Sequence, residues 1–340
     1  MLIVYDEEYT RHLASTNHPE APDRVRIVAE RLRAGGMLDE CVPPRPATLA
    51  ELTLVHPANY VERVRREVDA LGRTGQPAYL STGDTVIDAA SFDVASCAAG
   101  GAILAMERAT SEKRAAFAVV RPPGHHAEPA RGMGFCVFNN AAVAARAFTS
   151  RAGERALILD FDYHHGNGSQ AIAGEGVSYV SSHASPAYPG TGSSADNVYD
   201  SKGAVVNFPL PVSGYDTEAF VALWEHALRS LARATRPGLI VASAGYDFVA
   251  GDPVGDLRIA PAAASSLGRI IRSVADEYCE GRAIFVLEGG YDPNVLAECV
   301  IATIRGYESG ADALGAAAAE SVPRREQAIL TGLDGAFELA

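Results

Sequence analysis

The chain has 340 residues, of which 48% are hydrophobic and 21% charged, which is ordinary for a globular protein with one large α/β fold. Its net charge of -13 argues against general nucleic-acid binding and is compatible with a cationic substrate. No apolar run is long enough to span a bilayer, so we expect no membrane partner.

The cysteines and the N-terminal residues favour a cytoplasmic protein. The five cysteines are scattered and show no CxxC spacing, which is typical of reduced thiols. The first residues, MLIVYDEE, have neither a basic start nor a small-residue cleavage site, so no secretory signal is visible.

Apolar patterning predicts strands and helices that alternate along the chain. In chain order it predicts a strand over residues 2–5, helices over 25–32 and 61–71, a surface loop over 72–84 and a helix over 91–106. Strands over 116–120, 155–159, 177–180, 239–242 and 283–287 then alternate with helices over 141–148, 217–234, 261–279 and 294–307. Residues after about 310 are expected to be peripheral. This order implies a mainly parallel sheet covered on both faces, in a single domain over residues 1–340.

Polar residues follow the ends of five predicted strands. They are His125 and His126 after 116–120, Asp160, Asp162 and His164 after 155–159, Ser181, Ser182 and His183 after 177–180, Asp247 after 239–242, and Tyr291 after 283–287. In open α/β sheets the ligand crevice forms at the carboxyl ends of the strands. We therefore expect these residues to converge on one catalytic site.

Asp162, His164 and Asp247 are candidate metal ligands. Alternation along an extended backbone puts Asp160, Asp162 and His164 on one side. Carboxylate oxygen and imidazole nitrogen suit Zn²⁺, with Fe²⁺ as the second choice. With Asp247 as the third ligand, a coordination position stays open for water and a substrate carbonyl. The alternatives are a strand-end cap for the first stretch and a helix N-cap for Asp247.

The remaining residues suit proton transfer and substrate binding. His125 and His126 follow two prolines and a glycine, and adjacent histidines are better placed to move protons than to share one metal. Tyr291 follows two glycines and could donate a hydrogen bond to a developing oxyanion, or simply pack in a turn. Phe135 and Tyr188 could line a narrow slot, with core packing as the alternative.

These residues stand in motifs that resemble the zinc-dependent histone deacetylase family. The motifs are RPPGHHA, GFCVFNN, DFDYHHGNG, SSH with YPGTG, SAGYD with GDPVG, and EGGY, between about residues 18 and 307. The Asn in HHGNG and the Glu in EGGY are most similar to the class II and bacterial branch, which includes acetylpolyamine amidohydrolases. The resemblance implies the arginase–deacetylase fold, a three-layer α/β/α sandwich around a mainly parallel sheet.

The resemblance also implies the ion sites and the oxyanion donor. It assigns zinc to Asp162, His164 and Asp247, and polarisation of the scissile carbonyl to Tyr291. It further implies a structural K⁺ or Na⁺ held by Asp160, Asp162, His164, Ser181 and Ser182.

For the tandem histidines, the resemblance implies that both handle protons. Asp160 matches the aspartate that orients His125, and Asn167 stands where class I members carry an aspartate behind His126. Because an amide cannot stabilise an imidazolium as a carboxylate does, we expect His126 to be the base and acid, with an ordinary pKa.

The substrate residues implied by the resemblance are Gly134, Phe135 and Tyr188 in the tunnel, Arg24 at an inner pocket, and Asp84 at the rim. Val254 stands where the polyamine-selective animal enzyme carries a glutamate. We therefore expect broad deacylation of small, linear N-acyl amines.

Three functions compete for this set of residues. The first is zinc-dependent removal of acetyl or a similar acyl group from a small-molecule or peptide amine. The second is a binuclear ureohydrolase of the same fold, and the third is a non-catalytic binder of acylated ligands. Whether the chain forms a homo-oligomer stays open.

Overall fold

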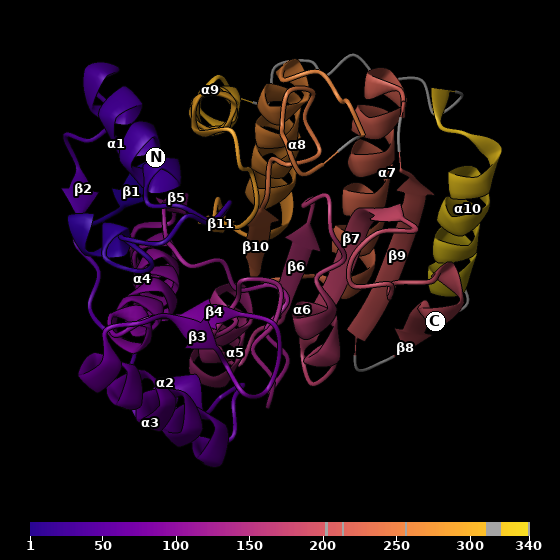
Figure 1. Ribbon diagram of the computed structural model, residues 1–340. Helices are drawn as coiled ribbons and strands as arrows, with labels where there is room; N and C mark the ends of the chain where they lie inside the picture. Colours follow the sequence, from indigo (N-terminus) through magenta and orange to yellow (C-terminus); the bar gives the residue numbers. More distant parts are fainter. Residues whose placement is uncertain (201–202, 213, 256, 311–320, 339–340) are drawn as a thin grey trace.

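The computed structural model describes residues 1–200, 203–212, 214–255, 257–310 and 321–338 (Figure 1). Within this part of the chain, nine strands form one sheet in the order β2-β1-β5-β11-β10-β6-β7-β9-β8. The strands are β1 (Leu2–Val4), β2 (Cys41–Val42), β5 (Ala116–Ala118), β6 (Ala156–Asp160), β7 (Val177–Ser185), β8 (Val198–Asp200), β9 (Gly203–Pro211), β10 (Leu239–Ala244) and β11 (Ala283–Leu287). Neighbouring strands are parallel except β8 and β9, which confirms the predicted mainly parallel sheet.

Helices cover both faces of this sheet. The longer ones are α1 (Asp23–Ala34), α3 (Ala58–Thr74), α4 (Ser91–Glu112), α5 (Asn140–Ala152), α7 (Thr217–Thr235), α8 (Ala262–Tyr278), α9 (Pro293–Glu308) and α10 (Arg324–Glu338). The short ones are α2 (Leu49–Leu52), α6 (Asn167–Ala171) and the 3₁₀ turns η1 (Glu7–Thr10) and η2 (Ser194–Asp196). In Figure 1, α7, α8 and α9 lie on one side of the sheet and α4 and α5 on the other, in agreement with their mutual contacts. This is the three-layer sandwich that the sequence predicted.

The central strands are buried along their whole length. Every residue of β6, β10 and β11 is buried, as expected for parallel strands covered on both faces. Their sequences are accordingly near-continuous apolar runs, which is why they could be predicted. The alanine-rich helix α4 contacts β1, β5 and β11 with small side chains that allow a close approach to the sheet.

Several predicted boundaries were wrong. β7 runs to Ser185 and not to residue 180, because buried Ser181 and Ser182 stay in the ladder with β9. The predicted loop over 72–84 contains the end of α3 and the strand β3 (Ala78–Tyr79), which pairs with β4 (Val86–Ile87). The apolar patterning predicts no strand at the positions of β2, β3, β4, β8 or β9.

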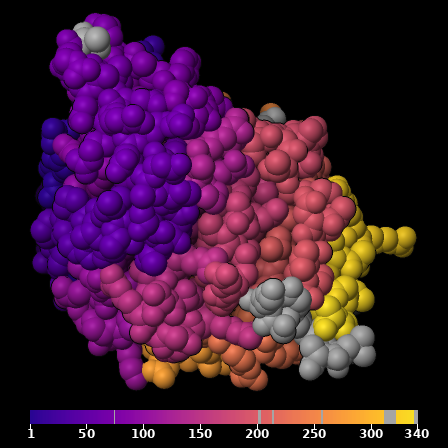
Figure 2. Space-filling view, turned by 90° about the horizontal axis from the view of Figure 1, so that it is seen from below, coloured from indigo at the N-terminus to yellow at the C-terminus, as the bar shows by residue number. Residues whose placement is uncertain are grey.

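The N-terminal and C-terminal parts lie on different sides of the molecule. Figure 2 shows the first hundred residues gathered on one side of the face seen from below, with the later segments on the other. Of the residues after 310 that were predicted to be peripheral, 311–320 lie outside the described residues. The helix that follows them, α10, packs on α7, where Asp334 contacts His226 at 2.9 Å.

Candidate active site

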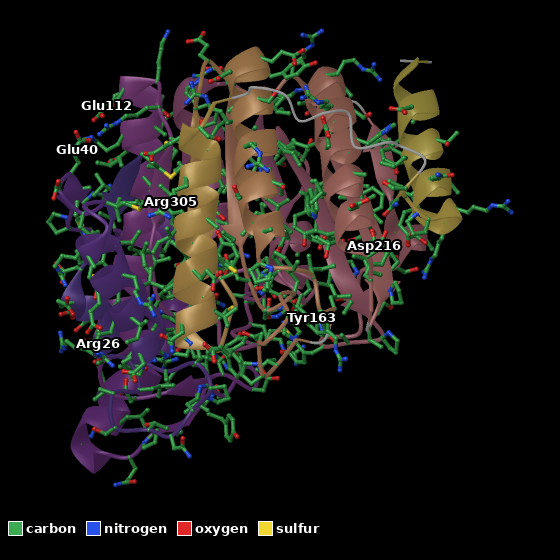
Figure 3. All side chains as sticks on the ribbon, turned by 90° about the horizontal axis from the view of Figure 1, so that it is seen from above. Arg26, Glu40, Glu112, Tyr163, Asp216 and Arg305 are labelled. Carbon is green, nitrogen blue, oxygen red and sulfur yellow. The ribbon has the colours of Figure 1, made fainter. Side chains whose placement is uncertain are left out.

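The candidate residues meet at one edge of the sheet because four neighbouring strands end there. In the strand order, β5, β11, β10 and β6 are adjacent, and each is followed by one group of the predicted residues. Figure 3 shows Tyr163, just beyond β6, at the loop-covered edge, and Glu112, just before β5, at the far edge. The expected convergence at the carboxyl ends of the strands is therefore what the structure has.

Asp162, His164 and Asp247 form a compact cluster whose side-chain atoms could hold a metal ion. The Nδ1 of His164 lies 3.1 Å from Oδ1 of Asp162 and 3.0 Å from Oδ2 of Asp247. One ligand atom from each residue lies within 4.8 Å of the others. Three such atoms on a tetrahedral ion with bonds of about 2.0 Å would lie roughly 3.3 Å apart, close to the observed spacing.

Backbone groups hold the two carboxylates in this arrangement. The amides of Tyr163 and Gly289 donate to Asp247 Oδ1 and Asp162 Oδ2, at 2.9 and 2.8 Å. The other oxygen of Asp247, Oδ2, is buried and accepts no well-aligned hydrogen bond, although His164 Nδ1 lies 3.0 Å away. Burial and the neighbouring Asp162 raise the pKa of Asp247 to about 7. An orphaned carboxylate oxygen that faces an imidazole and a second carboxylate fits a divalent cation.

His125 is hydrogen-bonded to Asp160 and lies beside Asp162 of the candidate metal-ligand group. Its Nδ1 lies 3.1 Å from Asp160 Oδ2, and its Nε2 lies 3.8 Å from Asp162 Oδ1. Burial disfavours the imidazolium, but the two carboxylates outweigh burial and raise the pKa of His125 to about 10. The hydrogen bond to Asp160 therefore favours the imidazolium form of His125.

His126 contacts Asn167 and not a carboxylate. Its Nδ1 lies 2.9 Å from Oδ1 of Asn167, as the resemblance implied. The expectation of an ordinary pKa was wrong: burial, together with His125 and His164, lowers the pKa of His126 well below its usual value. His126 is therefore neutral at neutral pH, in the form that can accept a proton.

Tyr291 projects from the Gly-Gly turn after β11. Burial and the Asp247 carboxylate raise the pKa of its phenol well above 10, so the hydroxyl keeps its proton. The guanidinium of Arg24 lies 5.0 Å from the ring centroid. A side chain at Gly289 in this turn would come within 2.6 Å of both metal-site carboxylates, so glycine is required there.

Two aromatic side chains, Phe135 and Tyr188, lie beside the candidate catalytic residues. The Phe135 ring lies 5.8 Å from that of Tyr291, and the Tyr188 ring lies 5.0 Å from that of His126. Gly134, with a φ of +57°, lies so close to His126 that a Cβ would come within 2.2 Å of its ring.

Asp84 is hydrogen-bonded to the segments that carry Gly134 and Tyr188. Its Oδ1 accepts from the amide of Gly134 at 2.9 Å, and its Oδ2 accepts from the hydroxyl of Tyr188 at 3.0 Å. The predicted rim residue is thus already hydrogen-bonded within the protein. Val254, in the GDPVG turn, is 39% exposed and is not a carboxylate that could bind a distant ammonium group.

Arg24 is buried beneath the Tyr291 turn. Its Nε donates to the carbonyl of Gly290 at 2.6 Å, and it also donates to the carbonyl of Glu288 and to the carboxylate of Glu20. These hydrogen bonds hold the backbone of the turn that carries Tyr291 in place.

For the predicted monovalent-cation site, the structure places Ser181 opposite Asp160 on adjacent strands. The Oγ of Ser181 is hydrogen-bonded to His183, and that of Ser182 accepts from Trp224 Nε1 at 3.0 Å. Each hydroxyl makes one of these hydrogen bonds, and a hydroxyl oxygen has two lone pairs, so these contacts leave both serine oxygens able to bind a cation.

Three further carboxylates, for which the sequence predicts no role, accept hydrogen bonds from residues of this site. Glu288 accepts from the amides of Gly124 and His125, at 2.6 and 3.1 Å. Asp252 accepts from the amide of Tyr291 at 2.5 Å, and Glu128 accepts from Asn167 at 2.9 Å. Each carboxylate lies in or beside one of the motifs RPPGHHA, GDPVG and EGGY, but its hydrogen-bond partner lies in another segment.

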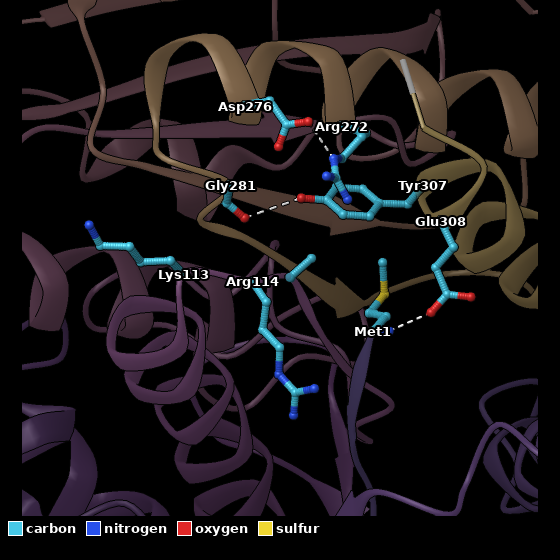
Figure 4. Close-up of a pocket in the computed structure, with 9 residues that line it drawn as sticks. Met1, Lys113, Arg114, Arg272, Asp276, Gly281, Tyr307 and Glu308 are labelled. Carbon is cyan, nitrogen blue, oxygen red and sulfur yellow. Dashed lines mark hydrogen bonds and ion pairs between the residues drawn. The ribbon is translucent and has the colours of Figure 1, made fainter. Parts of the chain in front are cut away.

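A separate shallow pocket of about 210 Å³ lies at the opposite edge of the sheet (Figure 4). Residues just before β1, β5 and β11 line it, so it is far from the carboxyl ends of the strands. Its cations are paired with acids: Arg272 with Asp276 at 2.5 Å, and Lys113 with Glu280 at 2.5 Å. It contributes nothing to the candidate site.

Comparison with known proteins identifies the family. The histone deacetylase domain matches residues 18–307, and the chain belongs to the histone deacetylase family. It is 35% identical over 297 residues to a probable deacetylase of Archaeoglobus fulgidus, covering 85% of this chain and 80% of that protein. It is 33% identical over 299 residues to the histone deacetylase-like amidohydrolase of Pseudomonas aeruginosa, covering 86% and 77%.

Other relatives are longer or structurally characterised. The chain is 35% identical over 319 residues to histone deacetylase 15 of Arabidopsis thaliana, covering 89% of this chain but only 56% of that protein. The crystal structure of the HDA15 HD domain superposes with a TM-score of 0.83 at 30% identity, covering 99% of this chain and 97% of that one. The fold is therefore the arginase–deacetylase fold.

Membership of this family indicates a hydrolase that acts on acylated substrates. All five cysteines are unpaired. Among the described residues, no helix combines the length and apolarity that a membrane crossing requires.

Proposed function

We propose that the protein is a zinc-dependent amidohydrolase that removes acetyl or a similar short acyl group from N-acylated amines. The observation that carries the proposal is the cluster of Asp162, His164 and Asp247, whose ligand atoms lie within 4.8 Å of one another in a member of the deacetylase family. Zn²⁺ suits this donor set best, with Fe²⁺ as the second choice. A bound divalent ion would supply Lewis acidity and lower the pKa of water.

The residues around this cluster carry the remaining chemistry. The neutral His126 takes the proton from the attacking water and returns it to the departing amine. The charged His125, held by Asp160, stabilises the negative charge that develops in the transition state. The protonated phenol of Tyr291 donates a hydrogen bond to the carbonyl oxygen as it becomes an oxyanion.

The substrate that fits this site is a small, linear N-acyl amine, acetyl-lysine among them. Phe135 and Tyr188 flank a slot that excludes branching near the amide. The negative net charge favours an amine-bearing substrate. At the position of Val254 there is no carboxylate to hold a distant ammonium, so tight polyamine selectivity is not expected.

The proposal extends to the organisation of the chain. Residues 1–340 would form one catalytic domain in a cytoplasmic, reducing setting. A structural K⁺ or Na⁺ would be held by side-chain and backbone oxygens of Asp160, Asp162, His164, Ser181 and Ser182.

A binuclear ureohydrolase is the weaker alternative. In the part of the chain that the structure describes, a single group of residues is arranged to hold a metal ion. A second metal would need further carboxylates beside it.

The test of the proposed activity is a comparison of kcat/KM for an acetyl-lysine peptide, acetylputrescine and acetylspermidine at one salt concentration. We expect turnover of all three within about a hundredfold, or roughly 2.7 kcal/mol in transition-state binding. A larger preference for one polyamine would contradict the broad specificity. Absence of turnover with every acyl amine, in metal-loaded protein, would contradict the activity.

A further inference from the structure

Three polar side chains form a chain behind the reacting groups. His126 Nδ1 lies 2.9 Å from Asn167 Oδ1, and Asn167 Nδ2 lies 2.9 Å from Glu128 Oε1. Asn167 is fixed as the first residue of α6. Glu128 is fixed by a tight turn, in which its amide donates to the carbonyl of Arg131 at 2.9 Å.

The chemistry of these groups fixes which atoms face each other. An ionised carboxylate only accepts hydrogen bonds, whereas an amide side chain has one donor end and one acceptor end. The NH₂ of Asn167 must therefore face Glu128, and its oxygen must face His126. Since that oxygen only accepts, the proton of the neutral imidazole must be on Nδ1, and Nε2 keeps its lone pair.

We propose that Glu128 is a positioning residue that orients the Asn167 amide and thereby selects the tautomer of His126 that can act as a base. The inference rests on the proposed function for its kinetic consequence. The contacts that support it are independent of the metal ligands.

Without Glu128, the side-chain amide of Asn167 could flip and exchange the positions of its NH₂ group and its oxygen. Its NH₂ would then donate to Nδ1 of His126, and the ring proton would move to Nε2, where no lone pair remains to take a proton. A catalytic histidine held in the wrong tautomer loses up to about 10⁴ in kcat. The thioether of Met133, 3.4 Å from Asn167 Nδ2, is only a weak acceptor and would keep part of the original orientation. We therefore expect a smaller loss.

Two substitutions at the same position separate orientation from charge. Glu128→Leu removes the acceptor, whereas Glu128→Gln keeps a carbonyl oxygen that can accept from Asn167 but removes the negative charge. We expect Glu128→Leu to lower kcat at least tenfold, with KM and metal content unchanged, and Glu128→Gln to stay within about threefold of wild type. Equal kcat for wild type and Glu128→Leu would overturn the proposal, and so would equal losses in the two variants.

An exchange of the two groups gives a second test. Asn167→Asp alone places two carboxylates against each other, so it should lower kcat. Adding Glu128→Gln supplies an amide that donates to the new aspartate, whose other oxygen accepts from His126. The double variant should recover most of the activity. A double variant no better than Asn167→Asp would contradict the inference.

Nitrogen-15 NMR of histidine-labelled, zinc-loaded protein reads the tautomer without turnover. The signals of His126 are assigned by their loss in His126→Ala. Wild type and Glu128→Gln should show a protonated Nδ1 and a bare Nε2, and Glu128→Leu should show a population protonated on Nε2. An unchanged tautomer in Glu128→Leu would sink the inference even if activity fell. Absence of turnover in the wild type would contradict the proposed function but not this inference, because the spectra would still show which tautomer His126 adopts.

Discussion

Asp252 holds the backbone of Tyr291 in place across a gap of 39 residues in sequence. Its Oδ2 accepts from the amide of Tyr291 at 2.5 Å and from that of Asp292 at 3.3 Å. Its Oδ1 accepts from the amides of Val254 and Gly255, at 2.8 and 3.2 Å. One carboxylate therefore ties the GDPVG turn to the turn that presents the proposed oxyanion donor.

Replacing this carboxylate should impair catalysis through Tyr291 while sparing the metal cluster. We expect Asp252→Ala to lower kcat by roughly tenfold or more, and Asp252→Asn, which keeps one acceptor oxygen, to lose less. In a Tyr291→Phe background, Asp252→Ala should add little, because residues that act as a unit are not additive. The double-mutant cycle is measured with one acetyl-lysine substrate. Fully additive losses would mean that Asp252 acts independently of the Tyr291 hydroxyl, and would contradict the prediction.

The phenol of Tyr291 should matter only in the transition state. Tyr291→Phe keeps the ring and removes the hydroxyl, and loss of one oxyanion donor typically costs roughly 10²–10³ in kcat. We expect that loss with normal metal content and an unchanged melting temperature. A loss below about threefold would mean that the ring serves packing alone.

The tandem histidines should differ in their contribution. If His126 moves the proton, His126→Ala should be more damaging than His125→Ala, which removes a supporting charge. Metal analysis of both variants controls for loss of the ion. Equal residual rates with the same pH profile would contradict this division of roles.

The raised pKa of Glu288 should make the wild-type protein lose stability as the pH rises, whereas a Glu288→Gln variant should not show this loss. Burial raises its pKa from 4.5 to about 7, despite His125 and the two backbone donors. The folded state therefore holds this proton more tightly than the unfolded state, and the stability it contributes below pH 4.5 is lost as the pH rises to 7. Glu288→Gln keeps an acceptor oxygen for the amides of Gly124 and His125 without that loss. In urea unfolding, the free energy of unfolding of Glu288→Gln relative to wild type should increase between pH 4.5 and 7, by on the order of 1–3 kcal/mol. A constant difference would contradict the assignment.

Much of this site could be predicted from local sequence. Asp162 and His164 are two residues apart at the end of an apolar run, so their proximity follows from backbone geometry. The position of Asp247 beside them follows from the strand order, because β6 and β10 are neighbours in a parallel sheet.

The supporting hydrogen bonds could not be predicted in this way. Glu288 and Gly124 are 164 residues apart, and Asp252 and Tyr291 are 39 apart, so nothing in either segment identifies the partner. The pKa of His126 likewise depends on the burial and neighbours that the folded chain provides. The extension of β7 was missed because Ser181 and Ser182 are polar, although they are buried in the ladder.

The most direct measurement is a metal titration of turnover. Protein stripped by a chelator should have no deacetylase activity, and adding Zn²⁺ should restore it in proportion to bound metal up to one ion per chain. Asp247→Ala, which removes one of the three ligands, should bind much less than one ion and stay inactive. Full activity in the metal-free protein, or a maximum reached only at two ions per chain, would contradict a mononuclear zinc amidohydrolase.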